Sequence, residues 1–179
     1  MSIEELEGSA FDDALTGSNA AEYIAGLAGN DSMSGGAGND IYLVDAAGDQ
    51  VLEAAGGGFD TLYAAVSIML PAHVEWVTLT GAGGLNASGT AAGGEVLIGN
   101  AWANVLHTGG GQGDGVDAGA GDDSLYDDGG SAFLSGGMGN DSYHIAGDDD
   151  TLTESAGWGV DTVYASGSYT LGDNLEQLV

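Results

Sequence analysis

The sequence contains no lysine, arginine or cysteine, and it has only one proline. Its 28 aspartates and glutamates give a net charge of −28, with no lysine or arginine to neutralise a phosphate group. This excludes nucleic acids and anionic membrane surfaces as partners and leaves metal cations as the natural ones. Without cysteine, neither a disulfide nor a thiolate metal site can form.

Long apolar runs and a conventional leader are also missing. No stretch approaches 18 uninterrupted apolar residues, so we expect no membrane insertion. The first ten residues have neither the basic nor the apolar segment of a secretory signal, so we predict none. The 35 glycines beside a single proline exclude collagen and indicate some other Gly-rich repeat.

The chain repeats itself at a spacing of 101 residues. Residues 34–43 read SGGAGNDIYL, and residues 135–144 read SGGMGNDSYH. The ungapped match continues through Glu53 and Glu154, Asp60 and Asp161, Tyr63 and Tyr164, and Glu75 and Glu176. Such a duplication predicts a repeat architecture. We expect two units stacked as one continuous elongated body: residues 1–81 with nonapeptides 8–43, and residues 82–179 with nonapeptides 90–144, each unit ending in a β-rich spacer.

A nine-residue pattern runs through each half. We count ten units, with Thr108 as a one-residue insertion. Position eight is apolar in every unit: Leu15, Ile24, Met33, Tyr42, Leu97, Leu106, Val116, Leu125, Leu134 and Tyr143. One apolar residue in nine cannot form the face of a helix. It suits a short strand with a single core-facing side chain, so the pattern predicts an all-β fold.

Position six of the nonapeptide is the second regular feature. It is a carboxylate in most units, namely Asp13, Glu22, Asp31, Asp40, Glu95, Asp114, Asp123 and Asp141, with Asn104 and Ala132 as the exceptions. The preceding glycines allow a tight turn with positive φ, in which carbonyl groups converge. Calcium takes six to eight oxygen ligands at about 2.3–2.6 Å, and stacked strands lie about 4.8 Å apart. Two stacked turns can therefore share one ion.

These units resemble the GGxGxDxUx nonapeptide of the RTX (repeats-in-toxin) family, which binds calcium. GGAGNDIYL and GGMGNDSYH match at every defined position. The resemblance implies a right-handed parallel β-roll, a β-solenoid with calcium in the Gly/Asp-rich turns. One coil of such a roll is two nonapeptides, so residue i stacks on residue i+18. Asp114 then faces Ala132 and should make a weaker site than Asp123.

The resemblance also implies a set of calcium ligands, for several ions. The side-chain ligands are Asp13, Glu22, Asp31, Asp40, Glu95, Asn104, Asp114, Asp123 and Asp141, and the carbonyl ligands include Gly26, Gly35, Gly119, Gly121 and Gly136. Asp49 and Asp150 lie 18 residues beyond Asp31 and Ala132 and could extend the rows. Glu53, Asp60, Glu154 and Asp161 in the spacers are either further ligands or groups that stabilise turns.

No catalytic constellation is found, and we predict that the protein is not an enzyme. There is no GxSxG or HExxH motif. His73, His107 and His144 fall at unrelated phases of the repeat and are interpreted as surface residues. Many glycines and 28 repelling carboxylates predict disorder without metal, so calcium binding would supply the free energy of folding.

The resemblance implies export by a bacterial type I secretion system, with residues 167–179 as the candidate signal. We therefore expect a secreted protein, extracellular or at the cell surface, that folds on meeting external calcium. One hypothesis is a structural protein that assembles head to tail into a filament or surface layer. It rests on an apolar-Glu-x-apolar pattern at residues 3–6, 74–77 and 175–178. The alternative is a C-terminal secretion and folding module of a larger toxin, adhesin or enzyme.

Overall fold

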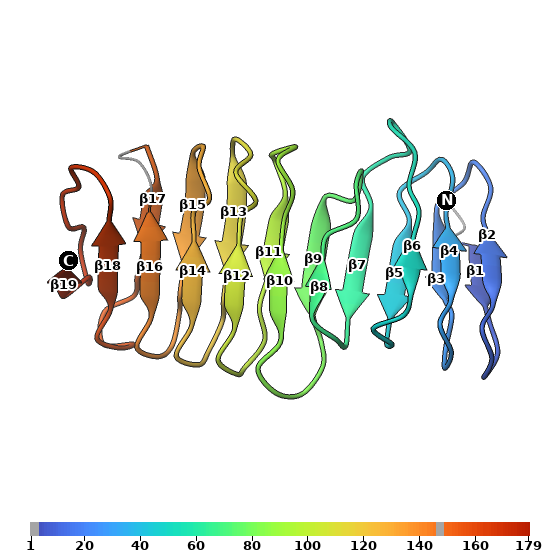
Figure 1. Cartoon of the computed structure of the whole chain (residues 1–179), viewed down its shortest axis with the longest axis horizontal. Coiled ribbons are helices and arrows are strands. Elements are labelled where there is room, and N and C mark those ends of the chain that lie inside the picture. The colour runs from blue at the N-terminus through green and yellow to red at the C-terminus, as the bar shows by residue number, and fades with distance from the viewer. Residues whose placement is uncertain (1–3, 146–148) are drawn as a thin grey trace. The chain divides into compact units, whose positions relative to one another are not determined.

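The computed structural model describes residues 4–145 and 149–179, and every regular element in these ranges is a β-strand (Figure 1). All strand pairs are parallel, as in a β-solenoid, which confirms the predicted fold class. No helix in these ranges is long and apolar enough to cross a membrane. The chain divides into two compact units, residues 1–80 (unit 1) and 81–179 (unit 2). Residue 3, the first of the residue 3–6 pattern, lies outside the described ranges.

Unit 1 winds between two sheets of short strands. In one sheet the neighbouring strands are β1 (Glu4–Glu7), β3 (Glu22–Ala25), β5 (Ile41–Val44), β7 (Thr61–Ala64) and β9 (Trp76–Leu79). In the other they are β2 (Ala14–Thr16), β4 (Ser32–Ser34) and β6 (Gln50–Val51), while β8 (Ile68–Met69) belongs to the spacer. Consecutive strands alternate between sheets, so each pair of strands completes one coil.

Unit 2 follows the same plan, except that its last two strands lie in the same sheet. One sheet contains β10 (Asn86–Ser88), β12 (Val105–His107), β14 (Ser124–Tyr126), β16 (Ser142–Ile145), β18 (Thr162–Ala165) and β19 (Gln177–Leu178). The facing sheet contains β11 (Val96–Ile98), β13 (Asp114–Asp117), β15 (Ala132–Ser135) and β17 (Thr151–Thr153). The strands are three or four residues long in the roll, because only the last residues of each nonapeptide lie outside a turn.

The core consists of position-eight side chains stacked in rows. Ile24, Met33, Tyr42, Leu97, Leu106, Leu125 and Tyr143 are fully buried, and Val116 and Leu134 nearly so. Leu15 pairs with Met33 at a separation of 18 residues, whereas Leu97 pairs with Val116 at 19 because the coil contains Thr108. The first spacer lengthens the coil again, so Tyr42 pairs with Leu62 at 20. The repeat arithmetic thus holds, with the extra residues accommodated in turns.

The first nonapeptide of the series predicted for residues 90–144 is preceded by a glycine that belongs to its turn. A Cβ on Gly89 would lie 2.7 Å from Glu95 Oε2, as a Cβ on Gly17 would lie 2.8 Å from Glu22 Oε2. Gly89 is therefore the first residue of the turn, and the turn carries one residue more than its counterpart. The physical reason is that a turn can absorb a residue without changing which side chain of the strand points inward.

The interpretation that His107 and His144 lie at unrelated phases is also wrong. Their rings stack in one row with Tyr126 and Tyr164 across β12, β14, β16 and β18, with centroid separations of 4.4, 4.2 and 4.8 Å. Neighbouring rings are within 7° of parallel. The two histidines are 37 residues apart, and the Thr108 insertion accounts for the one residue beyond two 18-residue coils. His107 also pairs with Asp128 at 3.1 Å.

Candidate metal centre

Backbone N–H groups and carboxylates form hydrogen-bonded ladders along each unit. The N–H of one position-six residue donates to a carboxylate oxygen one coil further on, at 2.7–3.0 Å. In unit 1 these carboxylate ladders run from Asp13 through Asp31 to Asp49, and from Glu22 through Asp40 and Asp60 to Glu75. In unit 2 they join Glu95 to Asp114, Ala132 to Asp150, and Asn104 through Asp123, Asp141 and Asp161 to Glu176.

The ladders bring together the acidic residues singled out in the sequence, except Glu53 and Glu154, and add two that sequence reasoning missed. Glu75 and Glu176 accept hydrogen bonds from the N–H groups of Asp60 and Asp161, each at 2.8 Å. The signal that could have found them is their recurrence at the same place in both halves. Their separation from the preceding ladder residue is 15, not 18, because the spacer coil is shorter there, and this concealed them.

Most ladder carboxylates have one oxygen that is buried and without a partner. Within residues 4–145 and 149–179 these oxygens belong to Glu22, Asp31, Asp40, Asp60, Asp114, Asp123, Asp141 and Asp150. In each aspartate Oδ1 is used in the ladder, so the orphan is Oδ2. A buried oxygen that bears charge and lacks a partner is costly. A hard cation between successive rungs would compensate it, so these residues fit calcium.

Burial makes the ladder carboxylates difficult to ionise in the absence of a cation. It raises the pKa of Asp141 to about 7, and the pKa values of Asp60, Asp123 and Asp150 each to about 6. The backbone N–H bond in the ladder lowers each value but does not cancel the effect of burial. A divalent cation would hold these groups ionised.

Position-one glycines make room for the orphaned oxygens. A Cβ on Gly26, Gly35 or Gly136 would overlap Oδ2 of the aspartate five residues later in the same turn. The turn backbone therefore wraps closely around the carboxylate, as a carbonyl ligand would require. Gly119 differs, since its carbonyl accepts the N–H of Met138 at 2.9 Å, and Gly121 donates to the carbonyl of Met138 at 2.8 Å. The five glycine carbonyls remain predicted ligands.

Other ladder residues have partners within their own turn. Oδ2 of Asp13 accepts both the N–H and the hydroxyl of Ser9, and the Glu95 carboxylate accepts the corresponding groups of Thr90. Oδ1 of Asn104 accepts the N–H of Asn100 at 2.9 Å. In these turns the residue after the first glycine donates hydrogen bonds to the position-six oxygen, which a cation would have to compensate in the other turns. Asp13, Glu95 and Asn104 are weaker candidate ligands than the orphaned carboxylates.

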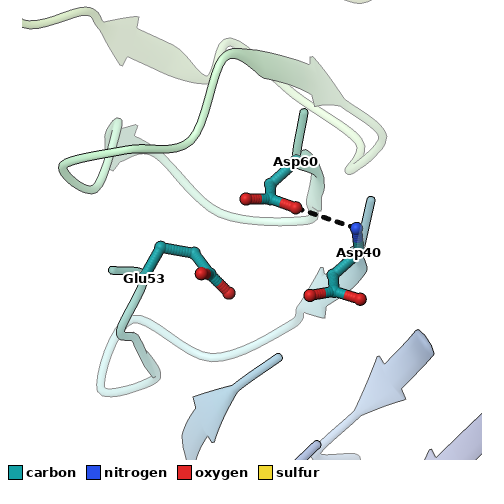
Figure 2. Close-up of side chains that lie close together, drawn as sticks. All are labelled: Asp40, Glu53 and Asp60. Carbon is teal, nitrogen blue, oxygen red and sulfur yellow. Dashed lines mark hydrogen bonds between the residues drawn. The ribbon is translucent and has the colours of Figure 1, made fainter. Parts of the chain in front are cut away.

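The spacers contribute two acidic triads. Asp40, Glu53 and Asp60 each place a carboxylate oxygen within 4.8 Å of the other two, and Figure 2 shows the three side chains converging. Asp141, Glu154 and Asp161 form the same group in unit 2. In both triads the two aspartates are buried, whereas the glutamate is only partly buried. The structure therefore places all four of these spacer residues beside the last nonapeptide rungs, Asp40 and Asp141.

We predict that Asp123→Ala weakens calcium-induced folding more than Asp114→Ala. Asp123 adjoins Asp141, whose Oδ2 is also orphaned, whereas Asp114 pairs with Ala132 on one side and with the internally bonded Glu95 on the other. Losing Asp123 should weaken calcium affinity at least about tenfold, or ~1.4 kcal/mol. Calorimetric titration of both variants measures the difference, and equal losses would contradict the assigned neighbours.

Comparison with known families identifies the repeats. The family model of the RTX calcium-binding nonapeptide repeat matches the chain in four copies, at residues 16–51 and 117–152. No curated protein matched the chain. The matched segments contain the central ladder residues, among them Asp31, Asp40, Asp123 and Asp141, whereas all members of the triads contributed by the spacers lie outside them. Repeats of this family are typically non-catalytic, and the proteins that carry them are typically extracellular and bacterial.

Proposed function

Because its residues 16–51 and 117–152 are RTX calcium-binding repeats, we propose that the chain is a non-catalytic secreted protein that folds when it meets extracellular calcium. The observation that carries this proposal is the set of buried, unpartnered oxygens in the carboxylate ladders. They lie where successive turns stack, so a cation bound there contacts two coils at once. Binding and coil formation are therefore one event.

The energetics of the roll support coupled folding. Each short strand buries only one or two large side chains, which is little apolar surface for the number of Gly-rich residues that must be ordered. The net charge of −28 opposes compaction as well. Bound calcium offsets both the small apolar surface and the charge repulsion, because it neutralises the ladder carboxylates and links successive turns. The binding free energy then appears as folding free energy.

Coupled folding suits export. RTX repeats are linked to type I secretion, and a chain that stays unfolded where calcium is scarce can be passed through a channel. Outside, calcium is plentiful and the roll forms. This applies equally to a free-standing protein and to the folding module of a longer exported one.

Free calcium should set the folded fraction, with a midpoint in the range of roughly 10⁻⁴–10⁻³ M that is typical of extracellular calcium modules. Tryptophan fluorescence in calcium buffers measures the midpoint, because Trp76 lies in unit 1 and Trp102 and Trp158 lie in unit 2. A midpoint below about 10⁻⁷ M would contradict folding outside the cell, since the chain would already be folded at sensor-level calcium.

Head-to-tail assembly is a second candidate function, favoured by one observation. In the described part of the chain β1 lies at the edge of its sheet and pairs only with β3. Open edges invite pairing, but charges on them oppose it, and β1 reads Glu-Glu-Leu-Glu. Assembly would therefore need calcium to neutralise the edge. Light scattering in the same calcium titration reports it, and a monomer at saturating calcium would exclude it.

A further inference from the structure

Glu53 is held by a tyrosine that reaches it from the core. Tyr42 is fully buried in β5, and its hydroxyl donates to Oε1 of Glu53. The N–H of Gly35 donates to both groups, at 2.5 Å to the Tyr42 hydroxyl and 3.2 Å to Glu53 Oε1. A spacer carboxylate is thus fixed beside the last nonapeptide coil, although it lies eleven residues from Tyr42 in the sequence.

Unit 2 repeats these hydrogen bonds and adds one, from the N–H of Gly137 to Glu154 Oε1 at 3.2 Å. Tyr143 is fully buried and donates to Glu154 Oε1, and the N–H of Gly136 reaches the two groups at 2.6 and 3.1 Å. The ladder bonds also agree: the N–H of Asp40 donates to Asp60 at 2.8 Å, and its counterpart in Asp141 donates to Asp161 at 2.9 Å. Two copies that have diverged elsewhere have kept the same geometry.

Position eight is tyrosine only in these two units, and in the other eight it is aliphatic or methionine. A buried phenol hydroxyl needs a partner, so a tyrosine is favourable only where a carboxylate can meet it. Both tyrosines precede a spacer. Tyrosine therefore occupies position eight only where a spacer glutamate accepts its hydrogen bond.

The triads carry oxygens that their own contacts do not satisfy. Oδ2 of Asp40 and of Asp60 are buried without a partner, and these side chains are 1 % and 0 % exposed. In unit 2 the same holds for Oδ2 of Asp141, which is 1 % exposed. Three carboxylates that converge within 4.8 Å repel one another unless a cation lies among them.

We propose that each acidic triad is a calcium site of its own kind, which joins a spacer to the last nonapeptide coil, and that Tyr42 and Tyr143 are positioning residues that aim Glu53 and Glu154 at the ion. This rests on the calcium-dependent folding proposed above. A turn site takes its side-chain ligands from nonapeptides alone, whereas a triad is complete only when the spacer has docked. The ion there makes spacer docking part of the calcium-dependent transition.

Calorimetric calcium titration of the full chain separates the triads from the turn sites. The double variant Glu53→Gln/Glu154→Gln should bind two fewer ions than the wild type, with calcium-induced β structure in the nonapeptides retained. The matched control Asp117→Asn/Asp173→Asn also removes two charges, from exposed side chains, and should bind the wild-type number. An unchanged ion number in the glutamate variant would overturn the proposal. Failure of the wild type to fold with calcium would instead overturn the proposed function.

The tyrosines are tested without removing a ligand. Tyr42→Phe/Tyr143→Phe keeps the core shape and all carboxylates, so two ions should bind about tenfold more weakly while the total number is unchanged. In the wild type, calcium should also shift the tyrosine absorption band, because an ion bound to Glu53 would weaken the hydrogen bond that Glu53 accepts from the Tyr42 hydroxyl. This shift should vanish in the glutamate double variant. Wild-type affinities in the phenylalanine variant would show that the tyrosines only fill the core and would overturn their role.

Discussion

Transfer from millimolar calcium into a chelator is expected to convert both units from parallel β structure to coil. The reason is the number of rungs that calcium would join. Glu22 with Asp40, Asp40 with Asp60, and Asp123 with Asp141 are neighbours whose second oxygens are all orphaned. A site filled at 100 times its Kd adds about 2.7 kcal/mol. Three such sites contribute about 8 kcal/mol, which is comparable with the whole net stability of a typical domain.

Far-UV circular dichroism measures this loss, and re-addition of calcium should restore the β signal. Magnesium is the control. It requires near-ideal octahedral geometry at about 2.0–2.1 Å and dehydrates reluctantly, so it should restore little of the signal at the same concentration. A spectrum that stays β-rich in the chelator would show that the ladders are stable without metal.

Acid is expected to act on the protein in two opposite ways. The folded-state pKa values of Asp60, Asp123 and Asp141 are raised by burial, to about 6, 6 and 7, from an ordinary value of 3.8. Protonation therefore favours the metal-free fold. This stabilisation is fully present below pH 3.8 and is lost as the pH rises through 6 to 7. In chelator, the chain should be more structured at pH 4 than at pH 7.5.

Calcium affinity should fall over the same interval. An ion can bind only to deprotonated carboxylates, so below these pKa values each binding event releases protons. For one proton released, the apparent Kd should rise about tenfold per pH unit, and from pH 7.5 to pH 5 the loss should approach a hundredfold. Calcium titrations at pH 5, 6 and 7.5 measure it. The same Kd at all three pH values would contradict the assignment of the buried aspartates as ligands.

Much of the fold follows from the repeat, because a solenoid converts sequence spacing directly into contacts. One apolar residue in nine specifies the row formed by Met33 and its neighbours, and a period of 18 places Asp13 beside Asp31. Residues inserted into the turns were the main reason that some contacts could not be predicted from the spacing. The turn from Gly89 to Glu95 and the insertion at Thr108 shift the count without shifting the strand, and the second of these concealed the stacking of His107 and His144.

The candidate site was harder to predict than the fold, because its distinctions depend on three-dimensional hydrogen bonding. Position six is a carboxylate in both Glu95 and Asp123. Thr90 donates two hydrogen bonds to the carboxylate of Glu95, whereas Oδ2 of Asp123 has no partner. Recurrence marked Glu53 as important without saying why. Its role became visible only through Tyr42, which meets it across the coil and not along the chain.

Calcium is expected to lie between successive rungs of the carboxylate ladders. Anomalous diffraction from crystals grown in calcium tests it most directly, because it places each ion. Peaks are expected at about 2.3–2.6 Å from the orphaned oxygens of Asp40, Asp60, Asp123 and Asp141. None is expected beside the internally bonded carboxylate of Glu95. An ordered roll with no peak in any ladder, or with peaks only at exposed aspartates, would contradict it.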